Sequence, residues 1–316
     1  MNRMSKYGLL TVSTLFLTAC SLPGLGTGIS DEGNIRIATQ SSTEMVILGY
    51  IVEGMVNHYT DMNSEVIQNL GSSTMVNQAL VGNDADIAAA TYTGTALTGD
   101  LGMSPITDPD EARAAVTKGF LEQYNIKYYP SYGFENTYAF LVTSELAEEH
   151  DLVTISDLTS IADDLTAGVD NSWMEREGDG YRAFLETYDF EFDTVYPMEI
   201  GLVYDAVQSG DMDVVLGYST DGRIASYDLV FLEDDLNFFP PYDASPSAKY
   251  ETIEKYPIVD EILLKLEGKI ETDVMQELNF TADEYLIEPA TVARKFLEAN
   301  NYFEDSEPYL EPVGGE

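Results

Sequence analysis

A short stretch, residues 86–95, constrains the fold of this chain more than any other. It reads Asp-Ile-Ala-Ala-Ala-Thr-Tyr-Thr-Gly-Thr. The apolar run 87–90 predicts a buried strand, and the hydroxyls and glycine after it predict a polar turn. Because ligands of open α/β sheets lie beyond the carboxyl ends of strands, Tyr92 and Thr95 could contact the same small molecule. On these ten residues alone, a buried tyrosine beside a hydrogen-bonded turn is the favoured interpretation.

Strands and helices alternate before this stretch. The expected order is strand, helix, strand, helix, strand, at residues 35–39, 41–59, 65–70, 72–80 and 86–90. Ser41 and Glu44 have the spacing of a capping box, with Ser41 as the N-cap of the first helix. Gln40 then lies at the mouth of a helix N-terminus, where backbone N–H groups point outward. This alternation predicts a parallel α/β unit.

The second half of the chain has similar turns after its strands. Tyr138 lies near the start of an apolar strand, and Tyr218 follows the strand 213–217. Tyr242 follows Phe239-Pro240-Pro241, a rigid segment because both prolines fix φ. Helices are expected at residues 247–256, 259–266, 273–280 and 291–300. Two α/β halves, each with an aromatic turn after a strand, predict two lobes that face one cleft.

Residues 1–19 predict a lipoprotein signal peptide. Arg3 and Lys6 supply its positive end, and the apolar run 9–17 is too short to span a bilayer. Leu17-Thr18-Ala19-Cys20 has the form of a lipoprotein cleavage box, and Cys20 is the single cysteine of the chain, which favours lipidation. An ordinary signal peptide with a chance cysteine is the alternative. Residues 20–33, rich in Gly, Ser and Thr, predict a tether.

The charge of the chain excludes several classes of partner. Its net charge is −41, from 56 acidic and 15 basic residues. A nucleic acid or an anionic lipid surface needs a basic face, so neither is expected to bind. Hydrophobic residues make up 44% of the chain, which indicates a folded protein with an acidic surface. That surface could serve solubility alone, or it could also attract a cationic ligand.

Catalytic residues are sparse. The two histidines, His58 and His150, do not have metal-ligand spacing. The segment 217–221, Gly-Tyr-Ser-Thr-Asp, lacks the second glycine of a nucleophile elbow, and no histidine follows it. Pairs of aspartates lack the spacing of a calcium loop. The sequence therefore predicts no catalytic residue, no metal site and no cofactor.

Tyrosines are the more informative residues. The chain has 21 tyrosines and one tryptophan. Tyr92, Tyr138, Tyr218 and Tyr242 are each expected at a strand end or a rigid turn, where a cleft would lie. Several aromatic faces around one small site form a cage for a quaternary ammonium, which has no N–H to donate to a carboxylate.

Several motifs resemble those of the substrate-binding lipoproteins of ABC importers for glycine betaine, carnitine and choline. They are Thr43-Glu44, Tyr92-Thr93-Gly94-Thr95, Asn136-Thr137-Tyr138-Ala139, Arg176 with Asp179-Gly180-Tyr181, Tyr218-Ser219-Thr220-Asp221-Gly222-Arg223-Ile224, and Phe239-Pro240-Pro241-Tyr242. The resemblance runs from about Ile35 to Phe303. It implies an α/β, bilobed, type II periplasmic-binding-protein fold, with one lobe at 34–134 and 239–312 and the other at 135–238.

The resemblance also implies roles for the site residues. The tyrosines at positions 92, 138, 218 and 242 would enclose a trimethylammonium group. Gln40, Thr95 and Arg176 would hold the carboxylate of the ligand, although some members of the family have a lysine in place of Gln40.

The function implied by this resemblance is capture of an osmoprotectant outside the cell and its delivery to an ABC permease and its ATPase. The protein would be anchored through Cys20 at the extracellular face of the cytoplasmic membrane. A sensor or adhesin lipoprotein with the same fold is an alternative. An enzyme on this scaffold is another, which the few histidines disfavour.

Overall fold

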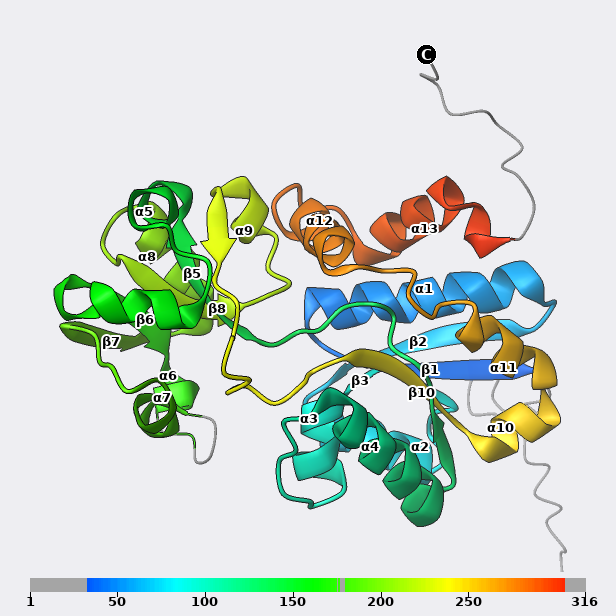
Figure 1. Ribbon diagram of the computed structural model, residues 1–316. Coiled ribbons are helices and arrows are strands. Elements are labelled where there is room, and N and C mark those ends of the chain that lie inside the picture. Colours follow the sequence, from blue (N-terminus) through cyan, green and yellow to red (C-terminus); the bar gives the residue numbers. More distant parts are fainter. Residues whose placement is uncertain (1–32, 175, 177–179, 305–316) are drawn as a thin grey trace, which may run out of the picture. The chain divides into compact units, whose positions relative to one another are not determined.

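A computed structural model describes residues 33–174, 176 and 180–304 (Figure 1). The contacts group the chain from Asn34 onward into one unit. The signal peptide, Cys20 and the tether up to residue 32 lie outside the described residues. No helix within the described ranges is long and apolar enough to cross a membrane.

The first sheet has the strand order β2-β1-β3-β10-β4. Its strands are β1 (Asn34–Gln40), β2 (Asn63–Leu70), β3 (Ile87–Tyr92), β4 (Ile126–Tyr128) and β10 (Ala244–Lys249). Strand β1 pairs in parallel with β2 and β3, which confirms the predicted parallel unit, whereas β10 is antiparallel to β3 and β4. The first sheet thus joins the N-terminal third of the chain to a strand that comes more than a hundred residues later.

Helices cover both faces of this sheet (Figure 1). They are α1 (Thr43–Tyr59), α2 (Ser73–Val81), α3 (Thr93–Thr95), the π-helical turn η1 (Ala96–Asp100), α4 (Pro109–Tyr124), α10 (Tyr250–Lys255), α11 (Pro257–Leu264), α12 (Thr272–Asp283), α13 (Pro289–Ala299) and η5 (Asn301–Phe303). Helix α1 lies in the core, since Ile47, Leu48, Ile51 and Val52 are fully buried. Burial of such side chains supplies much of the stability of this half.

The second sheet has the order β7-β6-β8-β5-β9. Its strands are β5 (Tyr138–Thr143), β6 (Thr166–Asp170), β7 (Thr194–Met198), β8 (Val214–Tyr218) and β9 (Leu229–Phe231). Short helices surround it: α5 (Ser144–His150), η2 (Ile155–Ser160), η3 (Ala162–Asp164), α6 (Asn171–Met174), α7 (Tyr181–Tyr188), η4 (Ile200–Leu202), α8 (Val203–Gln208) and α9 (Arg223–Ser226). Its core is aromatic, and Phe140 contacts Trp173, Phe184 and Phe192.

Two predicted boundaries are wrong. Residues 247–249 belong to β10, not to a helix, and the helix begins at Tyr250. The strand has a proline and no branched or aromatic side chain, so its residues signal a strand only weakly, and its pairing with β3 and β4 decides its conformation. Its proline, Pro246, is tolerated because the register with β3 shifts at that position.

The second wrong boundary is the N-cap of α1. Ser42 caps the helix, not Ser41, and its hydroxyl accepts a hydrogen bond from the backbone N–H of Met45 at 3.4 Å. Glu44 does not return to the cap as a capping box requires. Its side chain is instead free to take part in the site described below.

Candidate ligand-binding site

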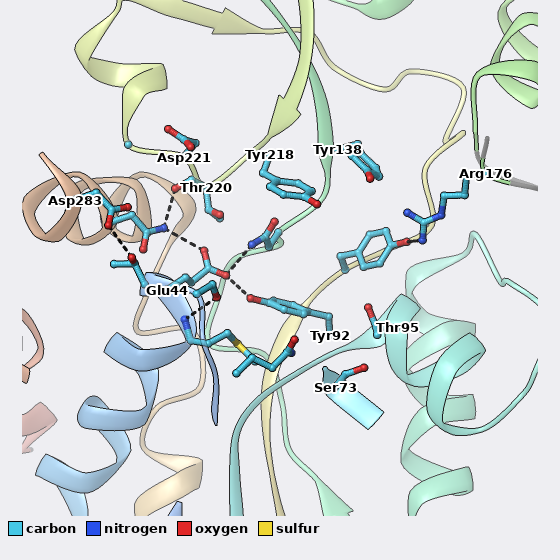
Figure 2. A pocket seen from close by; sticks show the side chains of 18 residues that line it. Glu44, Ser73, Tyr92, Thr95, Tyr138, Arg176, Tyr218, Thr220, Asp221 and Asp283 are labelled. Carbon is cyan, nitrogen blue, oxygen red and sulfur yellow. Dashed lines mark hydrogen bonds between the residues drawn. The ribbon is translucent and has the colours of Figure 1, made fainter. Parts of the chain in front are cut away.

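A cavity of about 580 Å³ lies among strand ends and turns of both sheets (Figure 2). All seven of the site residues expected from the sequence line it: Gln40, Tyr92, Thr95, Tyr138, Arg176, Tyr218 and Tyr242. They come from distant parts of the chain, so the fold brings together what the sequence separates. Cys20, the expected lipidation site, lies outside the described residues.

Three of the four tyrosines occupy strand ends. Tyr92 is the last residue of β3, Tyr138 the first of β5 and Tyr218 the last of β8. Strands β5 and β8 are antiparallel, and Tyr138 pairs directly with Tyr218. Their ring centroids are 5.3 Å apart and the ring planes are tilted by 31°. In an antiparallel pair, the first residue of one strand lies beside the last residue of its neighbour. Tyr138 and Tyr218 therefore lie side by side and form one aromatic wall of the cavity.

Tyr242 reaches the cavity from the segment between β9 and β10. A Cβ atom on Gly94 would lie 2.9 Å from Cε1 of Tyr242 and 3.0 Å from the carbonyl oxygen of Pro241. Only glycine allows this close approach, which gives the glycine of the Tyr92–Thr95 turn a steric reason. Arg176 donates a hydrogen bond from Nη2 to the hydroxyl of Tyr242 at 3.0 Å. Its guanidinium carbon also lies 5.7 Å from the ring centroid of Tyr138.

Gln40 and Thr95 line the cavity at the carboxyl end of the first sheet. Gln40 is the last residue of β1, and Thr95 ends the short helix α3 that follows β3. Both offer uncharged polar groups. Ser73, at the start of α2, lines the same cavity.

Glu44 is one of the cavity residues that were not predicted to be part of the site. Its side chain is only 5% exposed. Its Oε1 accepts hydrogen bonds from the hydroxyl of Tyr92 and from Nδ2 of Asn136 (2.9 Å), and its Oε2 accepts one from Nδ2 of Asn279 (3.2 Å). One sequence signal pointed to Glu44, the Thr43-Glu44 motif of the resemblance, while its spacing from Ser41 suggested a helix cap.

Glu44 also links the walls of the cavity. Asn279, on α12, donates a second hydrogen bond to the carbonyl oxygen of Thr220 at 2.9 Å, two residues after Tyr218. Burial first, and the neighbouring carboxylate second, hold the pKa of Tyr92 well above its ordinary value. Tyr92 therefore keeps its proton and remains a donor to Glu44.

Two further acids line the cavity. Asp221 accepts hydrogen bonds from Nε (3.0 Å) and Nη2 (2.9 Å) of Arg223, so its charge is neutralised within the protein. Asp283 accepts a hydrogen bond from the hydroxyl of Thr43 at 2.6 Å and is exposed to solvent. Glu44, by contrast, is buried.

The geometry suits binding better than chemistry. The hydroxyl of Ser219, in the segment compared above with a nucleophile elbow, donates to the carbonyl oxygen of Glu135 at 2.9 Å and accepts from the backbone N–H of Thr137 at 3.1 Å. These bonds fix a turn and activate no nucleophile. Among the residues that the structure describes, no group of three or more His, Cys, Asp or Glu side chains could hold a metal ion.

Comparison with known proteins places the chain in a family. Residues 33–299 match the substrate-binding domain of the ABC-type glycine betaine transport system. The chain is 51% identical over 296 residues to the carnitine transport binding protein OpuCC of Listeria monocytogenes, covering 94% of this chain and 96% of that protein. It is 31% identical to the ergothioneine transport permease/ergothioneine binding protein EgtU of Helicobacter pylori, with 92% of this chain and 52% of that protein covered.

A solved structure agrees with these matches. A crystal structure described as a glycine betaine/carnitine/choline ABC transporter matches with a TM-score of 0.84 and 46% identity, over 85% of this chain and all of that one. The predicted bilobed fold of the periplasmic binding proteins is thereby confirmed, and the family is one of transport proteins. The chain belongs to the family of substrate-binding domains of ABC-type glycine betaine transport systems.

Proposed function

We propose that this chain binds a quaternary ammonium compound of the glycine betaine, carnitine or choline type outside the cell and passes it to an ABC permease. The observation that carries the proposal is the cavity itself, in which Tyr92, Tyr138, Tyr218 and Tyr242 face one volume. Aromatic faces attract a cation that carries no N–H donors, and each ring contributes roughly 0.5 to 2 kcal/mol, depending on desolvation.

The other end of the ligand would meet polar groups. Arg176, Thr95 and Gln40 line the same cavity and offer a guanidinium, a hydroxyl and an amide. In this arrangement a ligand carboxylate binds Arg176 while the ammonium lies among the rings. The names of the relatives, which include carnitine and glycine betaine binding, support this class of ligand.

Binding would couple the two halves of the chain. The proposed lobes are 34–134 with 239–312, and 135–238. The strands of the first sheet fall in the former ranges and those of the second sheet in the latter. Since the cage tyrosines come from both sheets, closure of the lobes around the ligand would complete the cage. Substrate-binding proteins of importers face the outside of the cell, and a lipid on Cys20 would keep this one at the membrane.

A titration panel tests the ligand class. Glycine betaine, carnitine, choline and ergothioneine are each added to the purified chain, and melting temperature and heat of binding are measured. A ligand that binds only the folded state raises the melting temperature by mass action, so at least one of the four is expected to do so. If none of the four gives a shift or a heat at millimolar concentration, the proposal is wrong.

Two variants of one cage residue test the mode of binding. Tyr242→Ala removes a ring and should weaken betaine and choline by similar factors, equivalent to about 1 kcal/mol, because both share the trimethylammonium head. Tyr242→Phe keeps the ring and should change either affinity little. Unchanged affinities in Tyr242→Ala would remove this residue from the cage.

A further inference from the structure

Glu44 is a buried carboxylate that faces the cavity without a cationic neighbour. Its three hydrogen-bond donors, Tyr92, Asn136 and Asn279, are all neutral. In the part of the chain that the structure describes, no ion pair includes Glu44. Figure 2 shows it at one side of the cavity, with the hydroxyl of Tyr92 directed at its carboxylate.

Such a group is expensive to bury. Neutral donors stabilise a carboxylate, but they leave its net charge in a poorly solvated place. The other acids of the cavity do not share this situation, since Asp221 is bonded to Arg223 and Asp283 is exposed. Among the described acids that line the cavity, Glu44 is therefore the buried one without a positive partner.

We propose that Glu44 is the counter-charge of the cage and determines the preference of the site for a permanent cation over a neutral molecule of the same shape. The inference rests on the proposed function and adds a specificity-determining residue to it. The bound ammonium supplies the positive charge that the protein omits. Because a quaternary ammonium cannot donate a hydrogen bond, Glu44 acts on it through space and through the ring of Tyr92.

The hydrogen bond to Tyr92 strengthens this effect. A phenol that donates to a carboxylate gains electron density in its ring, and an electron-rich ring attracts a cation more strongly. Figure 2 shows Arg176 at the side of the cavity opposite Glu44, and its guanidinium donates a hydrogen bond to the hydroxyl of Tyr242. The negative charge of Glu44 therefore lies beside Tyr92 and draws the ammonium of a ligand toward that ring.

The test compares a charged ligand with its neutral isostere. Choline and 3,3-dimethylbutan-1-ol have the same shape, but a carbon replaces the nitrogen in the second. Each is titrated calorimetrically into the wild type and into Glu44→Gln. The variant should weaken choline by roughly 10- to 100-fold, the effect of one nearby charge at an effective dielectric constant of about 20, and leave the isostere within about twofold.

A matched control accounts for overall charge. Glu148 on α5 is exposed and does not line the cavity. Glu148→Gln removes the same charge and should leave both affinities within about twofold, because solvent screens distant surface charges.

A stability measurement separates this role from a structural one. In Glu44→Gln the removal of an unpaired buried charge offsets the loss of the hydrogen bond from Asn279, so without ligand the variant should melt within about 3 °C of the wild type. A residue that merely holds the cavity together would lower the melting temperature when changed. The expected pattern is therefore weaker choline binding with unimpaired stability.

Tyr92→Phe provides a second variant that does not depend on the folding of Glu44→Gln. It removes the hydroxyl but keeps both the ring and the Glu44 charge, so the ratio of choline to isostere affinity should fall by less than about threefold. A collapse of this ratio in Tyr92→Phe, or equal losses of choline and isostere in Glu44→Gln, would overturn the proposal. Failure of the wild type to bind any quaternary ammonium would instead refute the proposed function and, with it, this inference.

Discussion

Two buried carboxylates in the first half of the chain, Asp86 and Glu44, have opposite surroundings. Asp86 immediately precedes β3 and is 8% exposed, and Glu44, on α1, contacts the residue that ends β3 and is 5% exposed. Asp86 accepts hydrogen bonds from Nε (3.0 Å) and Nη2 (3.2 Å) of Arg36, and Nζ of Lys249 lies 3.2 Å away. Glu44 has only neutral donors.

This difference in charged partners distinguishes a carboxylate that stabilises the fold, Asp86, from one that belongs to the binding cavity, Glu44. Burial alone would raise the pKa of Asp86, but the hydrogen bonds and charge of Arg36, together with the charge of Lys249, hold it below its ordinary value. The protein neutralises this charge internally, and the pair stabilises the fold. The carboxylate of Glu44, in contrast, has only neutral hydrogen-bond donors. Its negative charge is therefore available to a bound cation.

The largest expected effect comes from breaking the internal pair. Arg36→Gln leaves Asp86 buried with only Lys249 near, and should lower the free energy of unfolding by about 3 kcal/mol near neutral pH, as loss of one partner of a buried pair does. Urea unfolding measures it. Since the pKa of Asp86 is lowered, its contribution is present above the unfolded-state pKa near 4 and is lost as pH falls through the folded-state value, so the deficit should shrink in acid.

The same variant should spare ligand binding, the reverse of what Glu44→Gln is expected to do. Lys118→Gln on α4 is the control, because it removes one positive charge from an exposed position. If Arg36→Gln and Lys118→Gln unfold alike, Asp86 is not stabilised by its pair and the contrast with Glu44 does not hold.

Arg176, which lines the same cavity as Glu44, tests the contrast between the two buried carboxylates with a positive charge. Arg176→Ala should weaken glycine betaine by about 30-fold, roughly 2 kcal/mol, because a hydrogen-bonded charge partner of the carboxylate is lost. Choline, which carries a hydroxyl there, should weaken by less than about threefold. Titration of both ligands measures the difference, and Arg182→Ala is a suitable control, since that side chain is 90% exposed. Equal losses for both ligands would remove Arg176 from the carboxylate site.

The sequence predicted the tyrosines of the site better than its acid. Tyr92 and Tyr218 end apolar strands, and the edge of a sheet gathers such residues, so a local pattern was sufficient to predict their place. Glu44 has partners 48, 92 and 235 positions away in the chain. A local pattern cannot show them, and the nearby serine made a helix cap the natural interpretation.

Strand β10 is a second case in which a local sequence pattern did not predict the structure. Its residues Ala244–Lys249 alternate between small apolar and polar types, but they include a proline and none of the branched or aromatic side chains that mark a strand. The strand exists because β3 and β4 pair with it on both sides. The parallel unit β1, β2 and β3 was predictable, in contrast, because its strands and helices each carry their own local pattern.

A partly buried carboxylate, Asp100, gives the smallest expected effect. Its Oδ1 is buried without a hydrogen-bond partner, as is Oδ1 of Asn77 in the same small internal cavity, and burial raises the pKa of Asp100 to about 6. The folded state therefore holds this proton more tightly than the unfolded state, and stability is lost as pH rises from about 4 through about 6.

Asp100→Asn removes the ionisable group and adds a donor, so it should raise the free energy of unfolding by about 1 kcal/mol near pH 7.5 and change it little near pH 4. Unlike Glu44, Asp100 has no expected ligand, so choline affinity should not change. Urea unfolding of both proteins at the two pH values measures the gain, and a gain of equal size at both would show that ionisation of Asp100 does not cause it.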